Sequence, residues 1–458
     1  MPWEISYYQT PHNSQAQPFT YAALTQIVKL TPFLSGEAIQ ILLTNSYGNH
    51  PLAFSELWLS RDSAFKDAVR ITKDQQTAFA IPAGQALGMD PISFKVEAGQ
   101  PLYFCLRATT PQTYVDVAST YDPSLVNAAL SGRSTALPQL TARWQQRKSW
   151  FNLAGFRVWR AKQAPLVELA GDSLIETGMV PAAVGRHLLT EFLDQVALIN
   201  TAISGSQLLR DASTTSPLLA TFGASLLHRV AHSPWRPKVM LASTGGNDLL
   251  IPPLAGQPLP TMKELQTGFM ELNRLVAQNG GVLLVPTLGP KRTPRAAYGA
   301  GQSRANLLRT ELNQWLLTQP YAVDVTSSLA DEAGYLAADC DFGDNLHLSP
   351  YGGQQLAQAL FARLDQILQN EWWKNAKMMA LISPSDRGFG TIGVKNFKRK
   401  GCWIRVRFLL DTFVDYCFDF SIGGPVYFTW ICSGKGSAKW VARVATNKDG
   451  PKSGAHGC

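Results

Sequence analysis

The chain has 458 residues, of which 45% are hydrophobic and 16% are charged. This length is too great for one ordinary domain, and the apolar fraction excludes a chain that is disordered throughout. The net charge of +8 lies entirely in residues 371–458, which hold 14 of the 41 basic and 6 of the 33 acidic residues. Residues 1–370 are therefore neutral overall, and a nucleic-acid partner is not expected for them.

Cysteines and apolar runs narrow the class of protein further. Six cysteines without a C-x-x-C pair do not make a disulfide scaffold and do not support a zinc site. Residues 1–8 lack a basic stretch followed by an apolar one, so no signal peptide is expected. No run of about 18 uncharged apolar residues predicts a membrane span. The expected location is the cytoplasm.

Residues 1–160 carry the pattern of an all-β domain. Short apolar runs at residues 39–43, 78–81, 92–96 and 102–106 are each followed by a turn signal rich in Gly, Pro, Asn or Thr. Strands of this length and spacing are typical of a β-sandwich or jelly roll.

Residues 161–370 change to alternating strands and helices. The predicted strands are 166–170, 196–199, 239–242, 282–285 and 321–325. Helices are predicted after the capping box Thr261–Glu264, over 306–317, and from Ser349-Pro350 to about Leu368. Five strands that alternate with helices predict a parallel sheet with helices on both faces, a three-layer α/β/α domain.

Four polar motifs follow strands of this predicted sheet. They are Gly171-Asp-Ser-Leu174, Asn200-Thr-Ala-Ile-Ser-Gly205, Gly245-Gly-Asn-Asp248 and Asp341-Phe-Gly-Asp-Asn-Leu-His347. Open α/β sheets bind ligands at the carboxyl edge of their strands, where these motifs gather. The first motif alone is better explained as a helix N-cap, but four motifs at one edge favour a catalytic site.

With these motifs in order, the chain resembles the GDSL, or SGNH, hydrolase family, whose fold is a flavodoxin-like α/β/α domain. The resemblance covers roughly residues 20–368. The N-terminal part of the chain resembles the accessory β-sandwich of a bacterial subgroup of the family. The segments that carry this resemblance include Ser46-Tyr-Gly-Asn-His-Pro-Leu52 and Ile81-Pro-Ala-Gly84. Thr201-Ala202 departs from the more usual Ala-Gly of the second motif.

The resemblance implies a serine esterase that works through an acyl-enzyme, without metal or cofactor. Ser173 would be the nucleophile, His347 its general base and Asp344 the carboxylate that orients the imidazole. The backbone N–H groups of Ser173 and Gly205 and the amide of Asn247 would form the oxyanion hole. The expected partner is a small-molecule ester, from an acylated carbohydrate to a lipid.

Other functions stay open at this point. The β domain could bind carbohydrate or take part in carbohydrate deacetylation, and lysophospholipid or thioester cleavage would use the same catalytic residues. Asp172 and Asp248, which adjoin the proposed catalytic residues, are equally well explained as structural. His228-Arg-Val-Ala-His232 has Arg229 where a zinc protease would need its glutamate, so helix-surface or packing roles are favoured for both histidines.

Residues 371–458 match neither pattern. They hold four of the six cysteines and a basic cluster, Lys398–Lys400 with Arg405 and Arg407, beside Trp403. This mixture could bind an anionic surface, but a poorly ordered appendage is the simpler interpretation. No structure or function is predicted for it.

Overall fold

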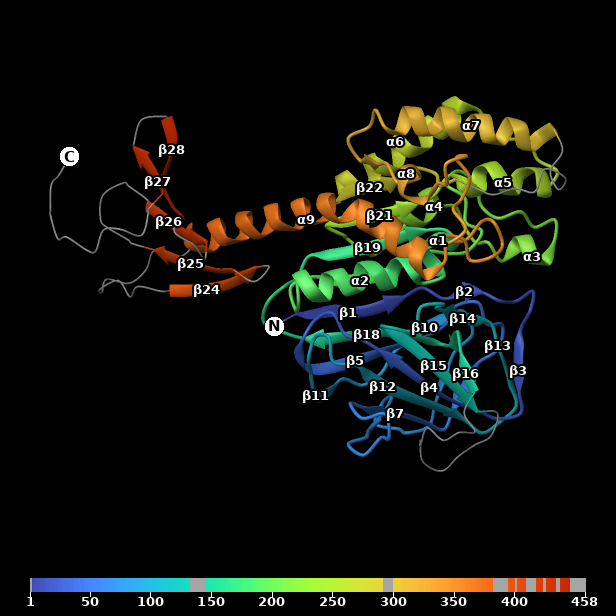
Figure 1. The fold of residues 1–458 in the computed structure, drawn as a ribbon. Helices are drawn as coiled ribbons and strands as arrows, with labels where there is room; N and C mark the ends of the chain where they lie inside the picture. Colours follow the sequence, from blue (N-terminus) through green and yellow to red (C-terminus); the bar gives the residue numbers. More distant parts are fainter. Residues whose placement is uncertain are drawn as a thin grey trace. The chain divides into compact units, whose positions relative to one another are not determined.

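In the computed structural model (Figure 1), the described residues are 2–131, 145–290 and 300–381, together with the backbone of five strands between residues 394 and 444. Contacts within the chain define two compact units, Met1–Lys374 and Asn375–Cys458. The first unit contains all the residues discussed as a site below.

The main sheet contains five parallel strands. These are β19 (Leu166–Gly171), β20 (Ala197–Asn200), β21 (Val239–Ser243), β22 (Val282–Pro286) and β23 (Ala322–Val323). They lie in the order β20-β19-β21-β22-β23, which is 2-1-3-4-5 by position in the chain, the flavodoxin-like order. All five predicted strands are confirmed, although β23 is shorter than its apolar run.

Nine helices are described beside these strands. They are α1 (Ser173–Glu176), α2 (Met179–Glu191), α3 (Pro217–Ala220), α4 (Leu226–Ala231), α5 (Gly246–Leu254), α6 (Met262–Gln278), α7 (Ala300–Leu316), α8 (Thr326–Leu329) and α9 (Pro350–Leu381). Helix α6 begins with the predicted capping box, in which Thr261 Oγ1 accepts from the N–H of Glu264 at 3.2 Å and Glu264 Oε2 accepts from the N–H of Thr261 at 2.6 Å.

The helices cover both faces of the parallel strands because consecutive residues of these strands are apolar and point to opposite faces. On β21, Met240 and Ala242 pack into one buried cluster with side chains of α4, α6 and α7. Val239 and Leu241 belong to another cluster with side chains of α2 and α9. Figure 1 shows α2 and the pair α6–α7 on opposite sides of these strands. Side-chain alternation with period two produces this three-layer packing.

Eighteen strands precede the parallel ones. They are β1 (Trp3–Gln9), β2 (His12–Asn13), β3 (Phe19–Tyr21), β4 (Leu24–Leu30), β5 (Gly36–Asn45), β6 (Leu52–Phe54), β7 (Glu56–Ser60), β8 (Val69–Ile71), β9 (Phe79–Ile81), β10 (Gln85–Gly88), β11 (Ile92–Val96), β12 (Leu102–Ala108), β13 (Gln112–Tyr114), β14 (Asp116–Ser119), β15 (Val126–Ser131), β16 (Gln145–Arg147), β17 (Ser149–Phe151) and β18 (Leu153–Trp159). The four predicted here correspond to parts of β5, β9, β11 and β12.

Several of these strands extend the parallel sheet. Strand β1 pairs in parallel with β20 and antiparallel with β18, and β5 and β10 continue the sheet outward. A second sheet, β16-β15-β4-β12-β7-β8, shares a buried apolar cluster with the first, in which the rings of Phe104 and Phe156 lie 5.6 Å apart. The result is one mixed sheet that runs through both halves of the unit. A separate domain over residues 1–160 stays a prediction.

The second unit is described only as backbone strands. They are β24 (Val394–Arg399), β25 (Cys402–Phe408), β26 (Cys417–Ile422), β27 (Val426–Ser433) and β28 (Ser437–Val444), paired antiparallel in chain order. The basic cluster of residues 398–407 falls partly on β24 and β25 and partly outside the described residues. Among the helices that the structure describes, none combines the length and the apolar character needed to cross a bilayer.

Candidate functional site

A tight turn at the end of β19 positions Ser173. Gly171 has φ +117°, and a Cβ at this residue would overlap the carbonyl oxygen of Ser243 on the neighbouring strand, so only glycine fits. Asp172 then caps α1, since its carboxylate accepts from the N–H of Leu174 at 3.1 Å. Ser173 is therefore the first residue of a helix at the carboxyl edge of the sheet, and the capping role considered for Asp172 is confirmed.

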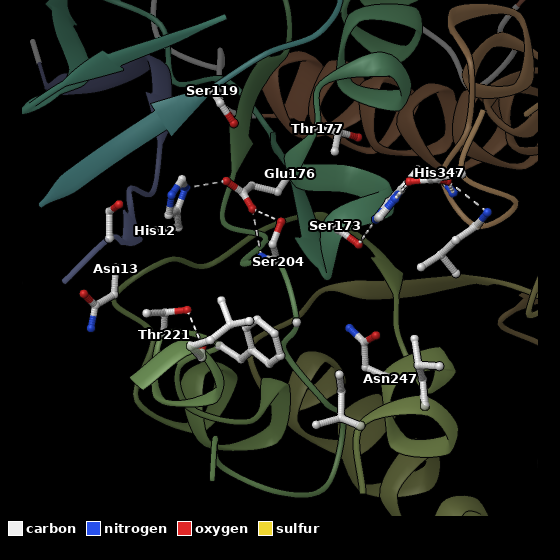
Figure 2. Close-up of a pocket in the computed structure, with 18 of the residues that line it drawn as sticks. His12, Asn13, Ser119, Ser173, Glu176, Thr177, Ser204, Thr221, Asn247 and His347 are labelled. Atoms are coloured by element: carbon white, nitrogen blue, oxygen red, sulfur yellow. Dashed lines mark hydrogen bonds and ion pairs between the residues drawn. The ribbon is translucent and has the colours of Figure 1, made fainter. Parts of the chain in front are cut away.

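Ser173, His347 and Asp344 form a continuous hydrogen-bonded row. Ser173 Oγ lies 2.8 Å from His347 Nε2, and His347 Nδ1 lies 2.6 Å from Asp344 Oδ2. Figure 2 shows the imidazole of His347 beside the Ser173 hydroxyl. The three side chains come from segments 174 residues apart in the chain, and the fold brings them within hydrogen-bond distance. A serine in this arrangement can pass its proton to the imidazole.

The loop that carries Asp344 and His347 is held by its own polar groups. Asp341 Oδ1 accepts from the N–H groups of Gly343 and Asn345, at 2.9 and 3.0 Å. Asp344 Oδ1 accepts from the N–H of Leu346 at 3.0 Å and from that of His347 at 2.8 Å. Partial burial disfavours the charge on Asp344, but the hydrogen bonds from His347 and Leu346 outweigh burial and hold the pKa of Asp344 below its ordinary value. The carboxylate is thus ionised at neutral pH.

Gly205 and Asn247 line the same cavity as Ser173 and His347, a cavity of about 530 Å³. Gly205 has φ +81°, and a side chain there would collide with the ring of Phe222. Asn247 is the second residue of α5, and its Nδ2 donates to the carbonyl of Ser206 at 3.1 Å. The predicted site residues are therefore together, and one amide proton of Asn247 is left for a ligand.

Asp248, next to Asn247, has a structural role. Its buried carboxylate accepts from the N–H groups of Leu208 and Leu209, at 2.7 and 3.0 Å. It therefore fixes the loop after β20 rather than its own loop after β21. Burial raises the pKa of Asp248 above its ordinary value, while these hydrogen bonds act in the opposite direction.

Three further polar residues line the cavity, His12, Glu176 and Ser204, and the sequence analysis did not predict them as site residues. His12 of β2 has its Nδ1 2.9 Å from Glu176 Oε1, and the backbone N–H of Ser204 donates to Glu176 Oε2 at 2.8 Å. The hydroxyl of Ser204 donates to the same carboxylate oxygen. Burial disfavours the charge on Glu176, but the hydrogen bonds from His12 and Ser204 prevail and lower the pKa of its carboxyl group. Glu176 follows Ser173 by one helical turn, and this spacing was the only signal available.

Arg229, in the motif that lacks the zinc-protease glutamate, connects the segments that follow β19 and β20. Its guanidinium donates to the carbonyls of Gly171 at 3.1 Å and Thr201 at 2.5 Å, and to Ser206 Oγ at 3.1 Å. Burial lowers the pKa of Arg229 to about 10, so the group stays charged at neutral pH. The loops that precede Ser173 and Gly205 are therefore joined by one buried cation.

Glu168 of β19 lies close to Arg229, and its burial is expected to make the free energy of unfolding depend on pH. Burial raises the pKa of Glu168 to about 7, although Thr201 Oγ1 donates to its Oε1 at 2.6 Å. A carboxyl group whose pKa is raised by folding contributes stability that is full below the unfolded value and is lost as the pH rises through the folded one. The contribution of Glu168 to the free energy of unfolding should fall by about 2.5 kcal/mol between pH 5 and pH 8, an effect that Glu168→Gln should remove.

Urea unfolding of both proteins at pH 5 and pH 8 measures this difference. Glutamine keeps the acceptor for Thr201 and resembles the protonated acid. Equal pH dependence in the two proteins would contradict the role assigned to Glu168.

Three other histidines, His187, His228 and His232, contact protein groups away from the cavity. His187 Nε2 lies 2.7 Å from Asp365 Oδ1, and its ring stacks on Phe361. His228 lies 3.4 Å from Asp211, and His232 Nδ1 faces the carbonyl of His228 at 2.8 Å. In the part of the chain that the structure describes, no three His, Cys, Asp or Glu side chains form a group able to hold a metal ion.

Comparisons with known proteins give structural likeness only. No family profile matches the chain, and no curated protein matches it. Among similar solved structures is TesA, 17% identical, which covers 44% of this chain and 99% of its own length with a TM-score of 0.32. A GDSL-like lipase from Bacteroides thetaiotaomicron is 14% identical, with coverages of 46% and 91% and a TM-score of 0.33. The acetyl xylan esterase AlAXEase is 14% identical, with coverages of 43% and 98% and a TM-score of 0.33.

The chain is thus similar to structures of GDSL-type lipolytic hydrolases over less than half of its length. At these identities and TM-scores the likeness itself supports no activity. The function is therefore inferred from the residues of the cavity and their geometry.

Proposed function

We propose that this chain is a serine esterase of the GDSL/SGNH type. The observation that carries the proposal is the row Ser173–His347–Asp344, with distances of 2.8 and 2.6 Å, at a cavity that Gly205 and Asn247 also line. In this proposal residues 161–370 form the three-layer catalytic domain, and residues 1–160 form an accessory β-sandwich that contributes to the cavity.

The proposed reaction has two halves. Ser173 Oγ attacks the carbonyl carbon of the ester while His347 Nε2 takes its proton, and the tetrahedral intermediate that forms carries a negative oxygen. The N–H groups of Ser173 and Gly205 and the amide of Asn247 stabilise that oxygen. The intermediate expels the alcohol, which takes the proton from His347. Water then cleaves the acyl-enzyme in the same way, so the reaction needs no metal or organic cofactor.

Covalent labelling tests the nucleophile directly. A fluorophosphonate reacts with a serine only where a base activates the hydroxyl. We expect one phosphonyl group per chain, located on Ser173 by mass spectrometry, with parallel loss of 4-nitrophenyl acetate hydrolysis. The heat-denatured chain is the control and should not be labelled. Labelling at another residue, or turnover that survives full labelling of Ser173, would contradict the proposal.

Lysophospholipids and thioesters remain alternative substrates, because the same three side chains could cleave them. A panel of one acetyl ester, one lysophospholipid and one acyl thioester separates these possibilities by their kcat/KM values.

A further inference from the structure

The cavity beside Ser173 has two chemically different walls. One is polar and comes from the N-terminal strands and the loops that join them, with His12, Asn13, Ser14, Gln17 and Ser119. The other is mostly apolar and comes from α3, the loop after it and α5, with Leu218, Phe222, Leu250 and Ile251. Figure 2 shows His12 and Asn13 on the side of the cavity away from His347. Most of these polar groups already bond to the protein, as when Ser14 Oγ donates to the carbonyl of Gln17 at 2.8 Å.

His12 has the best-defined orientation in the polar wall. Its Nδ1 faces Glu176, whose side chain is only 3% exposed, while the side chain of His12 itself is 28% exposed. An ionised carboxylate can only accept hydrogen bonds, so Nδ1 carries a proton. Within the described residues, Nε2 forms no hydrogen bond, and it can form one with a hydroxyl group, which both donates and accepts.

Both oxygens of Glu176 are already used, which fixes the imidazole. Oε1 accepts from His12, and Oε2 accepts from the N–H and the hydroxyl of Ser204, the residue before Gly205. His12 therefore cannot turn its Nδ1 edge to a ligand without leaving Glu176 unpaired, which costs free energy for a buried charge. The Nε2 edge is the one that remains for a ligand.

We propose that the natural substrate is an ester of a hydroxylated alcohol, and that His12 Nε2 forms a hydrogen bond with a free hydroxyl group of that alcohol. This inference rests on the proposed esterase function and adds the chemical class of the leaving alcohol. His12 is a specificity-determining residue, and the N-terminal strands supply the part of the cavity that distinguishes a polyol or sugar ester from an alkyl ester. A site built to form a hydrogen bond with a hydroxyl group discriminates strongly against the analogue that lacks that group.

Two esters that differ only in hydroxyl groups test the inference on the unmodified protein. Glycerol 1-acetate and propyl acetate have the same acyl group and the same three-carbon alcohol. We expect kcat/KM to be at least about 10-fold higher for glycerol 1-acetate, the difference that one hydrogen bond of ordinary strength gives. Equal values for the two esters would overturn the inference.

The variant His12→Asn separates recognition from folding. Asparagine places an N–H where Nδ1 stands, so the bond to Glu176 is kept, but it has no atom at the position of Nε2. We expect the ratio of kcat/KM for glycerol 1-acetate to that for propyl acetate to fall about 10-fold or more, a change that a uniform loss of activity would not produce. The control is His50→Asn, the same change at an exposed residue that does not line the cavity.

The outcomes distinguish this inference from the proposed function. If no ester is hydrolysed, the esterase proposal itself fails. If both esters are hydrolysed but His12→Asn lowers them equally, His12 is only a structural residue and the inference fails alone.

Discussion

Replacement of Ser173 by alanine is expected to lower kcat for 4-nitrophenyl acetate by a factor on the order of 10⁶, the loss typical of a triad nucleophile. The change removes the only atom that can form the acyl-enzyme, while the hydrogen bonds that hold Asp344 and His347 in place remain. The oxyanion donors also remain, so a residual activity of about 10³–10⁴ over water is expected.

Steady-state hydrolysis and thermal unfolding, measured on the same preparation, check this result. Ser63→Ala is the matched control, because it makes the same chemical change at an exposed serine that does not line the cavity. It should keep full activity. A Ser173→Ala protein with turnover within a few fold of the unmodified one would exclude Ser173 as the nucleophile.

Replacement of Asn247 by alanine is expected to lower kcat about 10²–10³-fold with little change in KM. One amide proton of Asn247 already binds the carbonyl of Ser206 at 3.1 Å, so the side chain is held and the second proton can point to the developing oxyanion. Because that charge exists only in the transition state, the loss should appear in kcat.

The ratio of the two kinetic constants separates this role from substrate binding. A rise in KM with unchanged kcat would mean that Asn247 contacts the ground state instead. Asp248 is not a suitable control, since its carboxylate holds the N–H groups of Leu208 and Leu209. Thermal unfolding of Asn247→Ala shows whether the loss of the bond to Ser206 disturbs the fold.

The sequence predicted the parts of this site that depend on local pattern. Apolar runs predicted the five parallel strands, and polar motifs directly after strands predicted that Ser173, Gly205 and Asn247 lie at one edge. Such residues gather because parallel strands end on the same side of a sheet. This prediction needs only the order and direction of the strands and no knowledge of side-chain contacts.

The other features of the site and the fold depend on contacts between segments far apart in the chain, and such contacts leave no periodic pattern in the sequence. His12 and Glu176 are 164 residues apart, and Arg229 reaches the carbonyl of Gly171 across 58 residues. In the sequence, His12 has no motif partner, and Arg229 stands in a segment that lacks the glutamate of a zinc protease. Neither residue is therefore marked as part of a site before the contacts are known. The pairing of β1 with β20 is equally invisible, because backbone groups of any sequence can form the ladder.

The pairing of β1 with β20 determines whether residues 161–370 can be separated from residues 1–160. Strand β20 has β19 on one side and β1 on the other, so the first strand of the chain covers the edge of the parallel strands. Removal of residues 1–160 would leave the N–H and C=O groups along that edge open to other chains, and an open edge of this kind promotes aggregation. The N-terminal strands therefore protect the edge of the parallel strands as well as line the cavity, and residues 161–370 are expected to need residues 1–160 for expression without aggregation.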